Sequence, residues 1–111
     1  MLTQYQEGTG EGITEIENKL KDDPNNPDLL DWLAFMYYSN NETEKAIATY
    51  VRALEVEPNN ASQHYYLGNC YVKSGQAEKA VCEWRRVVAL QPNKYVRKAQ
   101  ERIGKVGGDA S

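Results

Sequence analysis

The sequence predicts an all-α fold of about six helices, in which antiparallel helix hairpins stack side by side. The first observation is a pattern that occurs twice, 34 residues apart. Its matching pairs are Leu33 and Leu67, Tyr37 and Tyr71, Ala46 and Ala80, Arg52 and Arg86, and Pro58 and Pro92. A fixed period of this length indicates supersecondary units that bury their apolar faces against one another. The second observation is that apolar residues within each copy recur every three or four positions, as on one face of an α-helix.

Each copy, over residues 27–60 and 61–94, reads as two helices joined by a short turn. In the second copy, Asn60 is a suitable N-cap for the first helix, and the pair at 74–75 ends it. The second helix then places its apolar side chains on one face (Ala80, Val81, Trp84, Val87 and Val88). The small residue Gly68 allows the two helices to approach closely, while the large Trp84 fills the space beyond.

The flanking segments extend the pattern at both ends. Residues 10–26 align with the second half of a copy and predict an N-terminal capping helix that buries Ile13, Ile16 and Leu20. Residues 95–106 predict a C-terminal capping helix. Strict 34-residue register would bury several of its charged residues, which is costly, so we expect a loop two residues shorter that buries Val96, Ala99 and Ile103 instead. Residues 1–9 are expected to form a short turn or be disordered, and residues 107–111 a frayed tail.

The repeated residues resemble the tetratricopeptide repeat family, whose pattern is W-x2-L-G-x2-Y…A-x3-F…P. The second copy supplies matching residues at six positions (Leu67, Gly68, Tyr71, Ala80, Trp84 and Pro92). Departures occur at Leu30 and His64, where the family prefers Trp, and at Ala34, where it prefers Gly. The two copies cover 68 of the 111 residues. The resemblance implies a right-handed superhelix, or α-solenoid, that binds a peptide or helix of a partner protein in its concave groove.

Length and composition restrict the function further. A chain of 111 residues with no apolar run of about 20 residues and no N-terminal signal segment is expected to be one cytoplasmic domain, or a soluble fragment of a longer protein. Cys70 and Cys82 match no metal or redox motif and are expected to be free thiols. His64 is the sole histidine and falls at a core position. The sequence therefore predicts neither a catalytic site nor a metal site nor a cofactor.

Charge is distributed unevenly along the chain, whose net charge is −3. Residues 1–60 carry 12 acidic and 4 basic residues, a net charge of −8, whereas residues 61–111 carry 4 acidic and 9 basic residues, a net charge of +5. Two differently solvated ends are the simpler interpretation. The alternatives are head-to-tail self-association and an acidic partner at the C-terminal end.

The first helix of each copy has a second face that would line the groove. The predicted groove residues are Asp28, Asp31, Phe35 and Tyr38 in the first copy, and Ser62, Tyr65, Asn69, Val72 and Lys73 in the second. Grouped aromatic residues on such a face indicate a binding surface, unless they pack against neighbouring repeats or the terminal helix. Asp28 and Asp31 would repel the acidic chaperone tails that some members of the family bind. They favour a partner with apolar anchors and a basic residue near Asp31.

Three functions are compatible with these features. The first is a non-enzymatic protein–protein interaction module or scaffold. The alternative is an assembly or oligomerisation subunit that uses the charged ends of the stack. Nucleic-acid binding is a weaker third, because the net charge is negative, although basic residues gather in the C-terminal half (Arg85, Arg86, Arg97, Lys98, Arg102 and Lys105).

Overall fold

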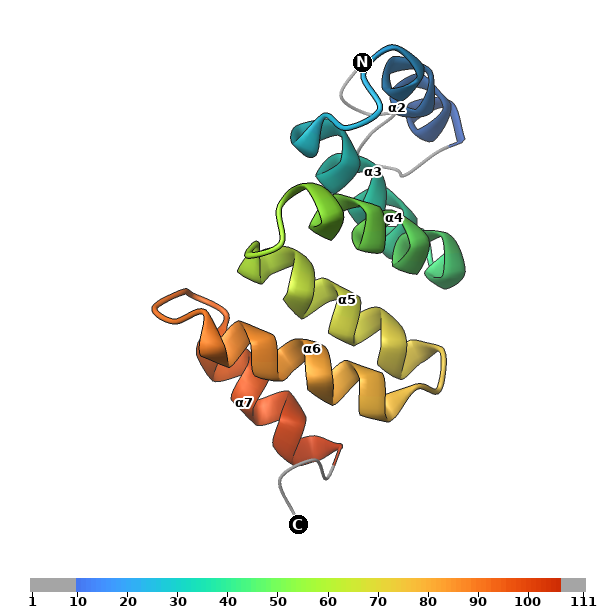
Figure 1. Cartoon of the computed structure of the whole chain (residues 1–111). Helices are drawn as coiled ribbons and strands as arrows, with labels where there is room; N and C mark the ends of the chain where they lie inside the picture. Colours follow the sequence, from blue (N-terminus) through green and yellow to red (C-terminus); the bar gives the residue numbers. More distant parts are fainter. Residues whose placement is uncertain (1–9, 107–111) are drawn as a thin grey trace. The chain divides into compact units, whose positions relative to one another are not determined.

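The computed structural model describes residues 10–106, and every regular element in this range is an α-helix (Figure 1). The helices are α2 (Gly10–Asp22), α3 (Pro27–Ser39), α4 (Thr43–Val56), α5 (Ala61–Lys73), α6 (Ala77–Ala89) and α7 (Val96–Lys105). The predicted all-α class and helix number are confirmed for this range, and the predictions for residues 1–9 and 107–111 lie outside it. The chain divides into two compact units, Met1–Pro58 (unit 1) and Asn59–Ser111 (unit 2), which are described separately.

In unit 1, α3 packs against both α2 and α4. The apolar face of α2 is buried as predicted, through Ile13, Ile16 and Leu20. The Tyr37 hydroxyl donates a hydrogen bond to the Glu17 carboxylate and so joins α3 to α2. Burial, and then the Glu17 carboxylate, raise the pKa of Tyr37 above its ordinary value, because both disfavour the phenolate. Tyr37 therefore stays neutral and keeps its proton for this bond.

Asparagine and glycine residues set the helix ends. Side-chain oxygens of Asn26 and Asn60 accept hydrogen bonds from the backbone N–H groups of Leu29 (3.1 Å) and Gln63 (3.0 Å), which confirms Asn60 as an N-cap. The turns that follow α3 and α5 contain left-handed residues, Asn41 with φ 61° and Gly75 with φ 81°. Asparagine and glycine adopt this conformation at the lowest cost, so each hairpin turn is encoded locally.

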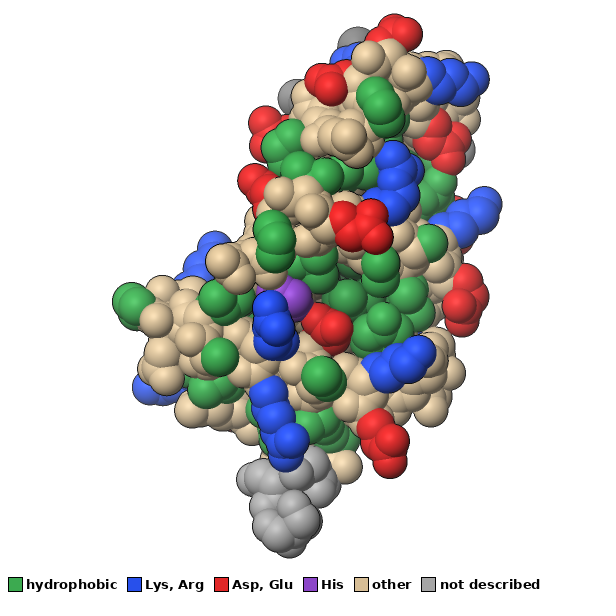
Figure 2. Space-filling model, in the orientation of Figure 1, with side chains coloured by type: hydrophobic (Ala, Val, Ile, Leu, Met, Phe, Trp, Pro, Cys, Tyr) green, Lys and Arg blue, Asp and Glu red, His purple; other side chains and the backbone are tan. Residues whose placement is uncertain are grey.

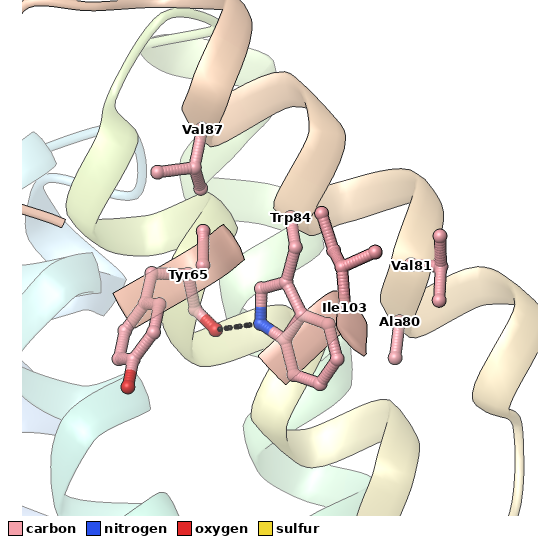
Figure 3. Packing of buried hydrophobic residues seen from close by; sticks show 7 residues of the cluster. Tyr65, Ala80, Val81, Trp84, Val87 and Ile103 are labelled. Atoms are coloured by element: carbon pink, nitrogen blue, oxygen red, sulfur yellow. Dashed lines mark hydrogen bonds between the residues drawn. The ribbon is translucent and has the colours of Figure 1, made fainter. Parts of the chain in front are cut away.

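The core of unit 2 is built around Trp84 of α6, which is 1% exposed. Its neighbours come from three helices: Tyr65 of α5, Ala80, Val81 and Val87 of α6, and Ala99 and Ile103 of α7 (Figure 3). The indole N–H of Trp84 donates a hydrogen bond of 3.1 Å to the backbone carbonyl of Tyr65 (Figure 3). A Cβ atom on Gly68 would lie 2.3 Å from Nε1 of Trp84. The predicted close approach of α5 and α6 at Gly68 is therefore confirmed, and it leaves no room for a Cβ atom at this position.

Helix α7 packs against α6 and begins at Val96, one residue after the predicted boundary of the terminal helix. Asn93 shapes the preceding loop, since its amide donates to the carbonyl of Val87 (3.0 Å) and its oxygen accepts from the N–H of Tyr95 (2.8 Å). Ala99 and Ile103 are buried and Val96 is half-buried. The expected face of α7 is thus in the core, but the predicted shortening of the loop is wrong: residues 90–95 connect α6 to α7, whereas the shorter segment 57–60 connects α4 to α5.

Both thiols are free, and they differ in burial: Cys70 is buried in α5 and Cys82 is exposed on α6. Burial raises the pKa of Cys70 to about 11 despite the opposing charge of Lys73. We expect an aromatic disulfide reagent at pH 8 to modify Cys82 rapidly and Cys70 only when unit 2 opens.

Because the unfolded thiol ionises near 9.0 and the folded one near 11, the contribution of Cys70 to stability is complete below pH 9 and declines as pH rises toward 11.

Stopped-flow absorbance on the wild type and on Cys82→Ser measures the two rates. The rapid phase should disappear in Cys82→Ser, while Cys70→Ser should retain it. Equal rates for the two thiols in the native chain would contradict the burial of Cys70.

Candidate functional site

The surface of α3 exposes two large aromatic side chains, Trp32 at 46% and Phe35 at 43%. They are three positions apart, so they lie on one face of the helix. The rings of Phe35 and Tyr38 continue this face, with centroids 6.0 Å apart. Asp28 is exposed and Asp31 half-buried one turn before the aromatic rings. We call these five residues (Asp28, Asp31, Trp32, Phe35 and Tyr38) the α3 surface.

Trp32 belongs to the α3 surface, although the sequence analysis did not place it in the groove. Its neighbours in the sequence, Leu33 and Ala34, are buried in the core. The spacing of Trp32 and Phe35 was the available signal, because residues at i and i+3 share a helix face. With Trp32 included, the α3 surface is more apolar than the four predicted residues alone suggested.

The predicted groove residues of α5 divide into exposed and buried ones. Val72 and Lys73 are exposed and Ser62 is half-buried, whereas Tyr65 and Asn69 are buried. The prediction that Tyr65 and Asn69 present open side chains is therefore wrong. A groove lined by the exposed members of both sets stays a prediction.

Aromatic packing within unit 2 explains the burial of Tyr65, which is 4% exposed. Its ring stacks on that of Tyr95 with centroids 5.1 Å apart, and the ring of Tyr66 lies edge-on at 5.2 Å. The Tyr65 hydroxyl accepts a hydrogen bond of 2.7 Å from Nε of Arg102 on α7. The terminal helix and its preceding loop thus cover Tyr65, which is the alternative that the sequence left open.

His64 has a structural role. Its Nδ1 atom is hydrogen-bonded to Oε1 of Glu83 at 2.6 Å, and this contact joins α5 to α6. Within residues 10–106, no three His, Cys, Asp or Glu side chains are placed to hold a metal ion together. None of the helices described is long and apolar enough to cross a membrane.

The predicted basic residues of unit 2 are all exposed, but the structure groups only some of them. Lys98, Arg102 and Lys105 of α7 line an open pocket of about 230 Å³ together with Tyr65 and Glu101. Arg85 and Arg86 lie on α6, and Arg97 lies on α7 outside this lining. In the lower part of Figure 2, which shows unit 2, Lys and Arg side chains (blue) stand at the surface.

Paired helices, small residues where the pairs cross and asparagine-capped turns together define a helical-repeat protein. Comparison with protein families identifies the repeat: residues 35–75 match the tetratricopeptide repeat. The match confirms the predicted tetratricopeptide repeat over these residues, and such repeats generally mediate protein–protein interaction. Comparison with curated proteins gave no significant match.

Proposed function

We propose that this chain is a non-enzymatic interaction module that binds a segment of a partner protein on the α3 surface. The observation that carries the proposal is the pair of exposed aromatic rings, Trp32 and Phe35, on one face of one helix. Large apolar side chains that are grouped at a surface mark interaction sites more often than single ones do. Tryptophan is also enriched among residues that dominate the energy of protein interfaces.

The exposed aromatic area is large enough to support binding. Covering about 100 Å² of apolar surface on each ring would contribute about 2.5 kcal/mol per ring at 25 cal/mol per Å². Association itself costs at least about 4 kcal/mol, so the two rings require further contacts to give micromolar affinity. Tyr38, half-buried beside Phe35, supplies additional ring area and a hydroxyl.

Charge indicates which partner segment fits. Asp28 and Asp31 lie one turn from the aromatic rings, and residues 1–60 have a net charge of −8. The acidic side chains of unit 1 are spread over its surface in the upper part of Figure 2. An acidic segment would be repelled, whereas a Lys or Arg near an apolar anchor would gain an opposite charge and a faster association rate. The proposed ligand is therefore an apolar segment with one or two basic residues.

The test is a selection of phage-displayed 12-residue peptides on the full chain, followed by affinity measurements on the selected sequences by fluorescence anisotropy. We expect enrichment of an aromatic or aliphatic anchor together with Lys or Arg. Trp32→Ala and Phe35→Ala should each weaken binding about tenfold or more, because each removes a central apolar contact. Asp31→Asn should weaken binding about threefold and reduce its salt dependence.

Val51→Ala is the matched control, because Val51 is an exposed apolar residue of unit 1 on α4. Its affinity should equal that of the wild type. Selected peptides that bind Trp32→Ala and Phe35→Ala as tightly as the wild type, with helicity unchanged, would show that the α3 surface is not the site.

Assembly through oppositely charged halves is the second candidate function, and the observation that favours it is the difference between −8 and +5 along the chain. In this case the basic residues of one copy would bind the acidic half of a second copy. The experiment on unit 2 described next includes self-association among its outcomes.

A further inference from the structure

We propose that unit 2 carries a second, separate binding site: a pocket that takes a carboxylate side chain from an acidic segment of a partner protein. The pocket is lined by Tyr65, Lys98, Glu101, Arg102 and Lys105, and we call it the Arg102 pocket. This inference goes beyond the proposed function, because it uses other residues and the opposite ligand charge.

Tyr65 holds the guanidinium of Arg102 in place. Its Nε donates to the Tyr65 hydroxyl at 2.7 Å, and its central carbon lies 5.5 Å from the centre of the Tyr65 ring. Tyr65 is itself fixed by its burial and by stacking on Tyr95. An anchored Nε leaves the two terminal amino groups of the planar fork as the groups that can receive a ligand. Because these amino groups are preorganised, less conformational entropy is lost when a ligand binds.

Within residues 10–106, Lys98, Arg102 and Lys105 form no ion pair with a carboxylate. The ion pairs Glu15–Lys19 and Glu42–Lys45 lie in unit 1. An arginine fork with lysines on either side is a site to which an incoming carboxylate can bind through two parallel hydrogen bonds.

The size and charge of the pocket favour a carboxylate over other anions. Its volume of about 230 Å³ is below the range of about 300–1,000 Å³ that is typical of small-molecule sites, so it suits a single side chain. Glu101 in the lining repels an anion in proportion to the charge of that anion. A carboxylate with one negative charge is repelled less than a phosphate dianion or a nucleic-acid backbone.

The probe for this site is fluorescein-labelled hexaglutamate with an acetylated N-terminus and an amidated C-terminus, so that only side-chain carboxylates are present. It is titrated with the full chain at 20 mM and 150 mM salt, and binding is followed by anisotropy. Arg102→Lys keeps the charge but removes the fork, and should weaken binding about tenfold, or about 1.4 kcal/mol. Tyr65→Phe keeps the ring but releases Nε of Arg102, and should weaken binding about threefold.

Arg97→Lys is the matched control, because Arg97 is an exposed arginine of α7 outside the pocket lining. Its affinity should be unchanged, and capped hexaglutamine should not bind. Circular dichroism of Tyr65→Phe and Arg102→Lys tests whether the two variants are folded. Helix content and unfolding midpoint should match the wild type.

Four outcomes would overturn the proposal. The first is the absence of hexaglutamate binding at 20 mM salt, and the second is an equal loss in Arg97→Lys and Arg102→Lys, which indicates diffuse attraction. The third is displacement of the peptide by inorganic phosphate or oligo-dT at lower concentration than by free glutamate. The fourth is salt-sensitive self-association in sedimentation that Arg102→Lys abolishes, which identifies a second copy as the occupant. None of these results bears on peptides bound at Trp32 and Phe35, so the two proposals fail separately.

Discussion

Gly68→Ala is expected to lower the free energy of unfolding of unit 2 by about 3 kcal/mol or more. The added Cβ would lie 2.3 Å from Nε1 and 2.7 Å from Cδ1 of Trp84. The indole is 1% exposed and packed on all sides, so it cannot move aside without shifting its neighbours. Movement would also break its hydrogen bond to the carbonyl of Tyr65 and leave a buried N–H without an acceptor. The sign of this effect is informative, because helix propensity alone would make alanine more stable than glycine by about 1 kcal/mol.

Urea unfolding followed by tryptophan fluorescence measures the effect. The chain has two tryptophans, and a Trp32→Phe background leaves Trp84 of unit 2 as the reporter. Trp84→Phe in the Gly68→Ala chain should recover part of the loss, because a smaller ring makes room for the methyl group; unfolding of this variant is followed by circular dichroism, since the tryptophan reporter is absent. Gly75→Ala is the control for backbone strain, since Gly75 has positive φ and no atom near its missing Cβ. It should cost about 1 kcal/mol. A more stable Gly68→Ala chain would refute the steric account.

The helices and most of the core could be predicted because their determinants are local. Asn60 caps the helix that it precedes, Gly75 closes the turn in which it lies, and the apolar face of α2 follows from three- and four-residue spacing. The sequence also predicted a small residue at position 68 opposite the large Trp84, and the structure shows that glycine itself is needed there. Each inference joined residues within one helix or one hairpin.

The burial of Tyr65 could not be predicted in the same way, because it depends on residues about 30 positions later. Tyr65 and Asp31 occupy equivalent places in the two copies, yet Asp31 is half-buried and Tyr65 is buried. The difference comes from Tyr95 and Arg102, which lie beyond the second copy and follow no repeat register. The pocket beside Tyr65 was likewise not predictable. Helical spacing alone puts Lys98, Arg102 and Lys105 on one side of α7, but the opening that they line also requires Tyr65 of α5 beside that helix.

The α3 surface illustrates the limit of a repeat pattern for predicting function. The family residues of α3, Leu33, Ala34 and Tyr37, are all buried and determine the fold. The proposed binding surface instead uses other positions of α3, of which Asp28, Trp32 and Phe35 are exposed. Spacing identified Asp31, Phe35 and Tyr38 as candidates. The same spacing also joins Trp32 to Phe35, but the exposure of these rings depends on how α2 and α4 cover the other sides of α3.

Ile16→Ala is expected to lower the free energy of unfolding of unit 1 by about 3 kcal/mol. Ile16 is 1% exposed and lies at the centre of the apolar face of α2, between Ile13 and Leu20. Its loss leaves a cavity against α3 and removes one of only three large apolar contacts of this helix. Because an isolated helix of 13 residues is marginally stable in water, α2 should detach before the rest of the unit unfolds. Hydrogen exchange should therefore accelerate throughout α2 and leave α4 little changed.

Glu15→Ala is the control, since Glu15 is exposed and its contact with Lys19 at 3.9 Å contributes less than about 1 kcal/mol. If exchange in α2 were equally slow in both variants, α2 would be held by contacts other than its apolar face, and its role as a cap on α3 would have to be abandoned.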